Sequence, residues 1–218
     1  MIMDYSDIYN YWNHNLCNGG NLQFPYFWGI SKVLEIGCGN GNDAIKFISQ
    51  GRSYFGIDLT DRAVEATKRK IRDMGQVYKM NAETLDFPDN HFDMVYSWGV
   101  IHHALNPEKV ISEIYRVLKP YGFIYIMLYN KLSFRYLVEI CILRRILWWL
   151  HYHKFNEIRK SIPHPTKEQW ISINTDNVGC PLSRVYTEKQ AKGLLKNFRF
   201  VTTHTRNYGW YRIIWGRK

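Results

Sequence analysis

Short apolar runs alternate with helix-forming stretches along residues 30–130, and this alternation most constrains how the 218-residue chain folds. A repeated order of strand and helix is typical of a parallel sheet with crossover helices. The predicted strands are residues 32–36, 53–58, 76–80, 92–99 and 122–130, and the predicted helices are residues 42–50, 61–74 and 106–118. Thr60 is the expected N-cap of the second helix, and Pro120 is expected to stop the third. The pattern predicts an α/β fold.

The alternation stops after Tyr129, and some 57 residues pass before a capping-box signal at Thr187 and Gln190 opens a helix predicted over residues 188–198. We interpret the intervening segment as an insertion. The chain then offers two strands separated by a turn at residues 207–209, which suits an antiparallel hairpin. We expect one domain with four parts: an N-terminal helical cap (1–30), a core (31–130), an insertion or lid (131–186), and a last helix with a terminal hairpin (187–218).

The charge is unevenly distributed. The formal net charge is +10, with 12 Lys/Arg against 14 Asp/Glu in residues 1–129 and 17 against 5 in residues 130–218. The second part therefore carries +12, which suits an acidic partner such as nucleic acid, a membrane surface or an anionic small molecule, or a solvated basic surface. No secretory signal is recognised at the start, so a cytoplasmic location is expected.

The cysteines and histidines do not form a metal-binding pattern. The four cysteines (Cys17, Cys38, Cys141 and Cys180) are far apart and form no C-x-x-C pair, which argues against a zinc knuckle or a disulfide framework. His151 and His153 have the spacing of a strand and lack a nearby acidic partner. We therefore expect reduced thiols and no metal.

Three glycines stand at alternate positions in "VLEIGCGNGND", directly after the first predicted strand. Without a Cβ atom, Gly37, Gly39 and Gly41 let the backbone approach a ligand closely. A dinucleotide fingerprint would need its third glycine at position 42, which is Asn42. Asp58 ends the second strand, where its carboxylate could accept both hydroxyls of a ribose. Adenosine with an amino-acid tail therefore fits this loop better than NAD.

Four motifs carry a family resemblance: "VLEIGCGNG", "FGIDLT", "NAETLDFPDNHFDMVYSWGVIHH" and "EIYRVLKPYGFIYIMLYN". In this order they resemble the class I S-adenosylmethionine-dependent methyltransferases of the type 11 subgroup, over roughly residues 30–130. The resemblance implies a Rossmann-like, doubly wound sheet of seven strands with the last strand antiparallel, here with a mainly helical insertion after strand five. It also implies S-adenosyl-L-methionine as the cofactor and methyl transfer as the activity.

The resemblance implies the cofactor-binding residues position by position. They are Glu35, Gly37, Cys38, Gly39 and Gly41 for the methionine part, Asp58 for the ribose, Leu59, Asn81, Ala82 and Glu83 for the adenine, and Ser97, Trp98 and Gly99 beside the methionine. Asn81 departs from the family, which usually has an acidic residue there. An amide oxygen would then meet the adenine amino group.

His102 and His103 are the candidate catalytic residues, because they follow the fourth strand directly and an imidazole can accept a proton near neutral pH. Packing or hydrogen bonding in the core is the alternative for both, since methyl transfer can proceed by positioning alone. The candidate substrate-binding residues are Trp12, Tyr129, Arg144, Trp148, Arg184 and Tyr186. Trp12 shares one aromatic helical face with Tyr5 and Tyr9, which could be a lid or part of the core.

Residues 134–154 are apolar on most sides of a helix, but four charges interrupt them and no apolar run exceeds five residues. That is far below the about 20 residues that cross a bilayer. We expect a lid over the substrate, a dimer interface that would make a homodimer, or a contact with a membrane surface.

The favoured function is methylation of an oxygen or nitrogen of a small-molecule acceptor, aromatic or anionic, in a biosynthetic pathway. RNA, including tRNA, is one alternative acceptor, motivated by the basic and aromatic C-terminal part. A lipid or quinone is another, and a non-catalytic regulator that binds adenosylmethionine is a further class.

Overall fold

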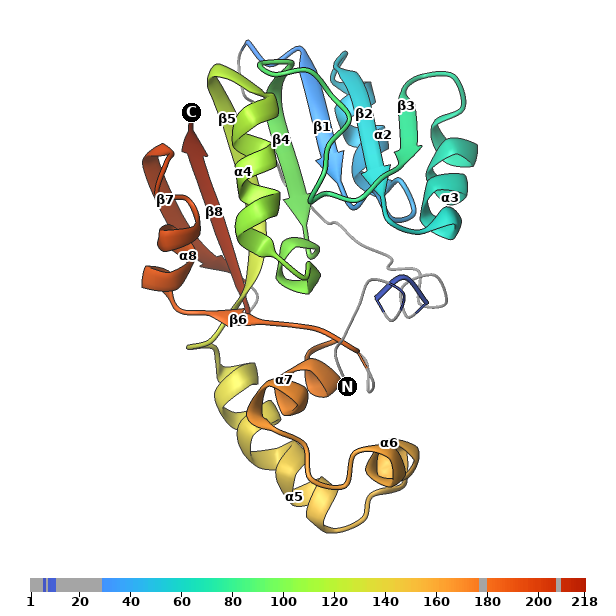
Figure 1. Ribbon diagram of the computed structural model, residues 1–218, viewed down its shortest axis with the longest axis vertical. Coiled ribbons are helices and arrows are strands. Elements are labelled where there is room, and N and C mark those ends of the chain that lie inside the picture. Colours follow the sequence, from blue (N-terminus) through green and yellow to red (C-terminus); the bar gives the residue numbers. More distant parts are fainter. Residues whose placement is uncertain (1–5, 7, 11–28, 177–179, 207–208) are drawn as a thin grey trace.

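The chain folds around a twisted sheet whose first five strands are parallel (Figure 1). The computed structural model describes residues 6, 8–10, 29–176, 180–206 and 209–218. The strands are β1 (Lys32–Ile36), β2 (Ser53–Asp58), β3 (Gln76–Lys79), β4 (Phe92–Trp98), β5 (Leu118–Asn130), β6 (Val185–Tyr186), β7 (Arg199–Arg206) and β8 (Tyr211–Arg217). Their order is β3-β2-β1-β4-β5-β8-β7, and β6 pairs with the end of β5.

The last strand is antiparallel to its neighbours. β8 lies between β5 and β7 and pairs antiparallel with both. This arrangement confirms the predicted doubly wound sheet of seven strands with an antiparallel last strand, to which the two-residue β6 adds a short eighth. The reversal of strand order at β1 and β4 creates the crevice in which open α/β sheets bind ligands.

Four helices cover the two faces of the sheet: α2 (Asn42–Ser49), α3 (Asp61–Ile71), α4 (Pro107–Val117) and α8 (Glu188–Leu194). On one face, Ile111 and Ile114 of α4 belong to a core that also includes residues of α8. On the other face, Phe47 of α2 and Ile71 of α3 are fully buried. Both faces of β1 and β4 are therefore covered, as expected for a parallel sheet.

The predicted helix caps are present. The Thr60 side chain accepts a hydrogen bond from the Ala63 amide, and Thr187 and Gln190 form a capping box at the start of α8. Three boundaries differ from the predictions by more than one residue: α3 ends at Ile71 instead of Met74, and the other two are the start of β5 and the end of α8. β5 begins at Leu118 because Pro120 lies in an irregular stretch of the pairing with β4, where its missing amide breaks no regular ladder. α8 ends at Leu194, since Gly193 weakens the last turn.

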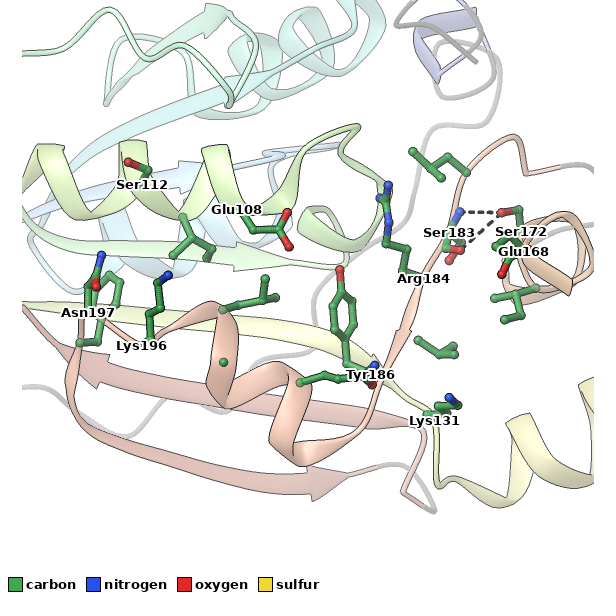
Figure 2. Close-up of a pocket in the computed structure, with 18 of the residues that line it drawn as sticks. Glu108, Ser112, Lys131, Glu168, Ser172, Ser183, Arg184, Tyr186, Lys196 and Asn197 are labelled. Atoms are coloured by element: carbon green, nitrogen blue, oxygen red, sulfur yellow. Dashed lines mark hydrogen bonds between the residues drawn. The ribbon is translucent and has the colours of Figure 1, made fainter. Parts of the chain in front are cut away.

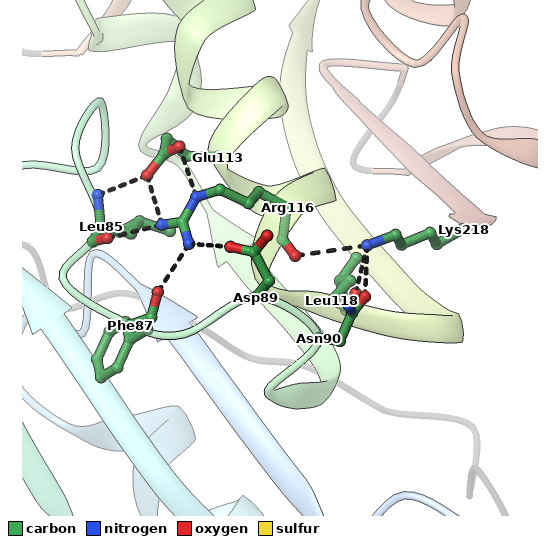
Figure 3. Close-up of polar contacts among 8 residues, drawn as sticks. All are labelled: Leu85, Phe87, Asp89, Asn90, Glu113, Arg116, Leu118 and Lys218. Atoms are coloured by element: carbon green, nitrogen blue, oxygen red, sulfur yellow. Dashed lines mark hydrogen bonds and ion pairs between the residues drawn. The ribbon is translucent and has the colours of Figure 1, made fainter.

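Arg116 in α4 fixes the loop that leads into β4 (Figure 3). Its guanidinium donates to the carbonyl oxygens of Leu85 and Phe87 at 2.7 and 2.8 Å, and to the carboxylates of Glu113 and Asp89. Five N–H donors in a rigid plane suit this arrangement. The loop after β3 is thereby held against α4.

The insertion is helical and lies beyond the carboxyl ends of the parallel strands (Figure 1). It comprises the π-helix η2 (Arg135–Leu143), α5 (Arg144–Trp149), the 3-10 turn η3 (His153–Phe155), α6 (Asn156–Ser161) and α7 (Lys167–Thr175). Its apolar residues form a small core together with Met127 and Tyr129 of β5 and with Trp210, and Trp148 meets Trp170 edge to face at 5.5 Å. Among the residues described, no helix has the length and apolar character needed to span a membrane.

Candidate functional site

The loop after β1 adopts a backbone that only glycines accept readily. Gly37, Gly39 and Gly41 have φ angles of +79°, +54° and +74°, in the left-handed region where other residues are strained. A Cβ atom at Gly37 would lie 2.1 Å from Cγ2 of Val100, in the loop after β4. The glycines thus let two loops at the carboxyl end of the sheet come together.

Asp58, the last residue of β2, holds the glycine loop from the neighbouring strand. Its Oδ2 accepts the Gly39 amide at 3.2 Å, and its Oδ1 accepts the amide and hydroxyl of Thr60 at 3.0 and 2.9 Å. Burial raises the pKa of the Asp58 carboxyl, and the hydrogen bonds from Thr60 oppose that rise. A carboxylate has about four lone-pair sites, so further donors can still bind.

Glu35 is buried beneath the loop. The Tyr54 hydroxyl donates to its carboxylate at 2.5 Å. Burial, followed by the nearby charge of Asp43, raises the pKa of Glu35 well above its usual range. Cys38 is also buried, which raises the pKa of its thiol and keeps it protonated.

Asn81 and Glu83 shape the loop after β3. Oδ1 of Asn81 accepts the Glu83 amide at 2.9 Å, and the Glu83 carboxylate accepts the Asn106 amide, at the start of α4, at 2.7 Å. Ala82 between them and Leu59 after β2 are half-buried. The side-chain oxygens of Asn81 and Glu83 therefore accept backbone hydrogen bonds that fix this wall of the crevice.

The end of β4 closes the crevice. The Ser97 hydroxyl donates to the Ile36 carbonyl at 3.1 Å, tying β4 to β1. Trp98 is half-buried and meets Tyr211 edge to face at 5.7 Å. Gly99 follows with a φ of +76°, which turns the chain out of the strand.

His102 and His103, in the 3-10 turn η1 (Ile101–His103), are both buried. The ring of His102 is 4.0 Å from that of Tyr129 and 4.2 Å from that of His103. Neither ring nitrogen of His102 makes a well-formed hydrogen bond to any residue that the structure describes. Burial, and then the charge of His103, lower its pKa well below the usual value, so His102 is neutral.

His103 is bound to the insertion. Its Nδ1 lies 2.6 Å from the Leu182 carbonyl, and its Nε2 lies 3.1 Å from Oδ2 of Asp176. Burial alone would lower its pKa, but the interactions with Asp176 and with the Cys180 sulfur together outweigh burial and raise the pKa of His103 to about 10. The pKa of Asp176 falls to about 2, because His103 stabilises the carboxylate more than burial disfavours it. His103 is therefore a cation at neutral pH.

Tyr129 completes this cluster. Its hydroxyl donates to Asp176, and its ring stacks on Trp210 at 4.4 Å. The donor atoms of His102, His103 and Asp176 lie within 4.8 Å of one another, a spacing that one metal ion could bridge. However, both Asp176 oxygens already face His103 or Tyr129, and we assign no metal here.

The predicted substrate residues are not all gathered in one place, although Arg184 and Tyr186 line the same cavity. Arg184 donates to the carbonyls of Ala104 and Leu105 at 2.6 and 3.1 Å. Arg144 pairs with Glu139 inside the insertion, at 2.7 Å. These guanidinium groups bind the chain itself.

Two of the four aromatic candidates, Trp148 and Tyr186, also occupy separate positions. Trp148 packs in the insertion core, whereas Tyr186 lines a cavity of about 900 Å³ between α4, α7, α8 and β6 (Figure 2). This cavity does not include the glycine loop. Trp12 lies outside the residues that the structure describes. Tyr9, from the same predicted helical face, is described by the structure, and its hydroxyl donates a hydrogen bond to Asp61, at the start of α3, at 2.6 Å.

Sequence reasoning missed Asp176 and Trp210. Asp176 lies 47 residues from Tyr129 in a polar stretch that carries no motif. Trp210 belongs to the terminal hairpin, whose aromatic residues gave no sign of which strand they would meet. No local signal could have identified either residue.

Residues 34–126 match a family model described as a methyltransferase domain. A ubiquinone/menaquinone biosynthesis C-methyltransferase of Psychromonas ingrahamii is 33% identical over 115 residues, which cover 47% of this chain and 46% of that relative. The chain thus spans about half the length of this curated relative.

Solved structures share the fold over more of the chain. A SAM-dependent methyltransferase of Methanosarcina mazei superposes with a TM-score of 0.65 at 21% identity, covering 88% of this chain and 94% of the other. A 1,6-didemethyltoxoflavin-N1-methyltransferase of Burkholderia thailandensis has a TM-score of 0.56 at 17% identity, with 87% and 71% covered.

Proposed function

We propose that this chain transfers a methyl group from S-adenosylmethionine to an oxygen or nitrogen of a small molecule. Residues 34–126 form its class I methyltransferase domain, which uses S-adenosylmethionine as the cofactor. The observation that carries the proposal is the loop from Gly37 to Gly41, locked to Asp58 at the crevice of the sheet. The left-handed glycines let the loop pack closely against Val100 and Thr67 at the edge of the crevice, and the half-buried Asp58 carboxylate offers acceptors for a ribose.

We assign the predicted cofactor residues as follows. Asp58 would accept the ribose hydroxyls with the lone pairs that Gly39 and Thr60 leave free. Asn81 and Glu83 would support the adenine wall through the backbone that they fix. The pKa of Glu35 lies well above the usual range. From beneath the loop, Glu35 would therefore support the methionine part of the cofactor by hydrogen bonding more than by its charge.

When bound, S-adenosylmethionine supplies an electrophilic methyl group. The protein's main task is to align the acceptor and exclude water, and such positioning lowers a barrier by about 7 to 11 kcal/mol. For an oxygen or nitrogen acceptor a proton must also leave. Of the two histidines, only His102 is neutral near pH 7 and able to take it, because His103 is held as a cation by Asp176.

The role of His102 can be tested by its pH profile. Substitution with Gln preserves size and polarity but removes the basic nitrogen. If His102 is the base, this variant loses about 100-fold or more in kcat, and the rate of the native enzyme is flat from pH 7 to 9, since the pKa of His102 lies well below 6.5. An unchanged kcat in the variant would leave positioning as the whole mechanism.

A second candidate is a quinone-like acceptor methylated at carbon. The Psychromonas relative is named for such a reaction, and Tyr129 at the end of β5 stacks on Trp210, which directly precedes β8. A planar acceptor ring would suit this region. RNA is less favoured, since the sequence carries no recognisable RNA-binding motif.

The deciding experiment uses S-adenosylmethionine labelled in its methyl group. The protein is incubated with a deproteinised native-source extract, and the products are separated into RNA, lipid and water-soluble fractions. Label in a water-soluble small molecule supports the proposal, and label in a quinone-like lipid supports the second candidate. Label in RNA that ribonuclease removes contradicts both. Asp58→Ala is the variant expected to be inactive. Asp73→Ala makes the same substitution at an exposed position and should keep the activity.

A further inference from the structure

An apolar surface of the insertion has no partner among the residues that the structure describes. We call it the docking face, and it consists of Ile142, Leu143, Ile146, Leu147, Trp149 and Leu150. All six side chains are exposed, and Trp149 is 76% accessible. Large apolar side chains gathered in this way on a surface mark an interaction site.

The helical spacing shows that the docking face is one continuous surface. Leu143, Ile146, Leu147 and Leu150 stand at i, i+3, i+4 and i+7, which places them along one side of the helix. The opposite side packs inward, since Trp148 contacts Trp170 of α7. Figure 1 shows α5 at the end of the molecule farthest from the sheet. The helix therefore has a filled inner side and an apolar outer side.

The segment of chain that carries this face has an excess of positive charge. Residues 131–160 contain seven Lys/Arg and two Asp/Glu. Both acidic side chains are paired, Glu139 with Arg144 and Glu157 with Lys160. Arg145 and Lys154 are exposed. The segment thus presents an apolar strip bordered by cations.

We propose that the docking face binds the surface of an anionic lipid bilayer. A basic helix with an apolar side lies in the plane of a membrane, with its apolar side chains in the headgroup region and its cations at the phosphates. Trp149 and the nearby exposed Tyr152 suit this interface, because each combines an apolar ring with a polar group.

Charge argues against a second copy as the occupant. In a two-fold contact the same patch meets itself, so the cationic borders of two docking faces would be brought together. An anionic bilayer instead complements both the apolar strip and its border. This inference does not depend on which acceptor the enzyme methylates.

The test is sedimentation of the full chain with vesicles. We expect it to sediment with vesicles of phosphatidylglycerol and phosphatidylcholine at low salt, less at high salt, and hardly with phosphatidylcholine alone. Trp149→Glu and Leu150→Glu should each weaken binding by about tenfold or more, because each places a carboxylate at the apolar interface. Met74→Glu is the matched control, since Met74 is an exposed apolar residue on the sheet domain.

Two results would overturn the inference. One is failure of the native protein to sediment with anionic vesicles at low salt, and the other is equal binding by the native protein and both α5 variants. A dimer in solution that the same variants dissociate would assign the docking face to self-association instead. Calorimetric binding of S-adenosylhomocysteine, measured in parallel, separates these outcomes from failure of the methyltransferase proposal, because the variants should bind it normally.

Discussion

Nε2 of His103 lies 3.1 Å from Oδ2 of Asp176, and this buried ion pair joins the turn after β4 to the end of α7. The two residues are far apart in the sequence and belong to different parts of the fold, the sheet domain and the insertion. Asp176 also accepts the Tyr129 hydroxyl. The ion pair therefore links the insertion to the edge of the sheet at which the crevice lies.

The first prediction concerns pH. The pKa of His103 rises from 6.5 to about 10 on folding, so its contribution to stability is complete below pH 6.5 and disappears as the pH rises towards 10. The pKa of Asp176 falls from 3.8 to about 2, so its contribution is complete above pH 3.8 and disappears as the pH falls towards 2. The pair should stabilise the fold most between about pH 4 and 6.5.

His102 opposes this effect on the acid side, because its pKa falls on folding and charging it destabilises the fold below pH 6.5. The contribution of His103 to the free energy of unfolding should therefore be measured as the difference between His102→Gln and the double variant His102→Gln/His103→Gln. Denaturant unfolding should show that this difference in the free energy of unfolding decreases steadily between pH 6.5 and 10. A difference independent of pH would show that His103 is not charged by its partner.

The second prediction concerns Gly37. Replacement with Ala forces a left-handed backbone on a residue with a Cβ atom, at a cost of about 1–3 kcal/mol, and places that atom 2.1 Å from Val100. We expect lower unfolding stability and loss of cofactor binding. Gly193→Ala is the control, because Gly193 lies in α8 with open space around it. That change should stabilise the protein by about 0.5–1 kcal/mol, and both are measured by thermal unfolding with and without S-adenosylhomocysteine.

The third prediction concerns Asp58. Asp58→Ala removes the acceptors proposed for the ribose and the bond to Gly39. Charge-assisted hydrogen bonds contribute about 1.5–3 kcal/mol, so calorimetry should show S-adenosylhomocysteine binding weakened by about 10- to 100-fold. Asp73→Ala should bind as the native protein does. If both variants bind equally well, Asp58 does not hold the ribose.

The fourth prediction distinguishes two roles for Arg184. The guanidinium donates to the carbonyls of Ala104 and Leu105, so Arg184→Met should lower unfolding stability by about 1–3 kcal/mol. Arg199→Met, an exposed change on β7, should have little effect. A variant of full stability with a raised KM for the acceptor would instead support the substrate-binding role predicted from the sequence.

The glycine loop and the strand ends beside it could be predicted because their signals are local, and their role in holding the cofactor stays a proposal. Gly37, Asp58 and Ser97 each stand directly at the end of a strand, and the carboxyl ends of parallel strands meet at one edge of a sheet. The antiparallel last strand was implied by the family resemblance and agreed with the predicted terminal hairpin, whereas the order of the strands came only from the structure. The predicted acceptor residues fared differently, since Arg144 and Arg184 bind the chain itself and remain proposals as substrate contacts.

The sequence by itself determined the sheet, its crossover helices and the loop that marks the crevice, since short-range periodicity and glycine conformation act within a few residues. Only the tertiary structure decided that His103 is a cation bound to Asp176 while His102 is neutral. It also decided that the outer side of α5 stays exposed. Ion pairing, burial and exposure depend on which distant segments meet, and no local pattern specifies that meeting.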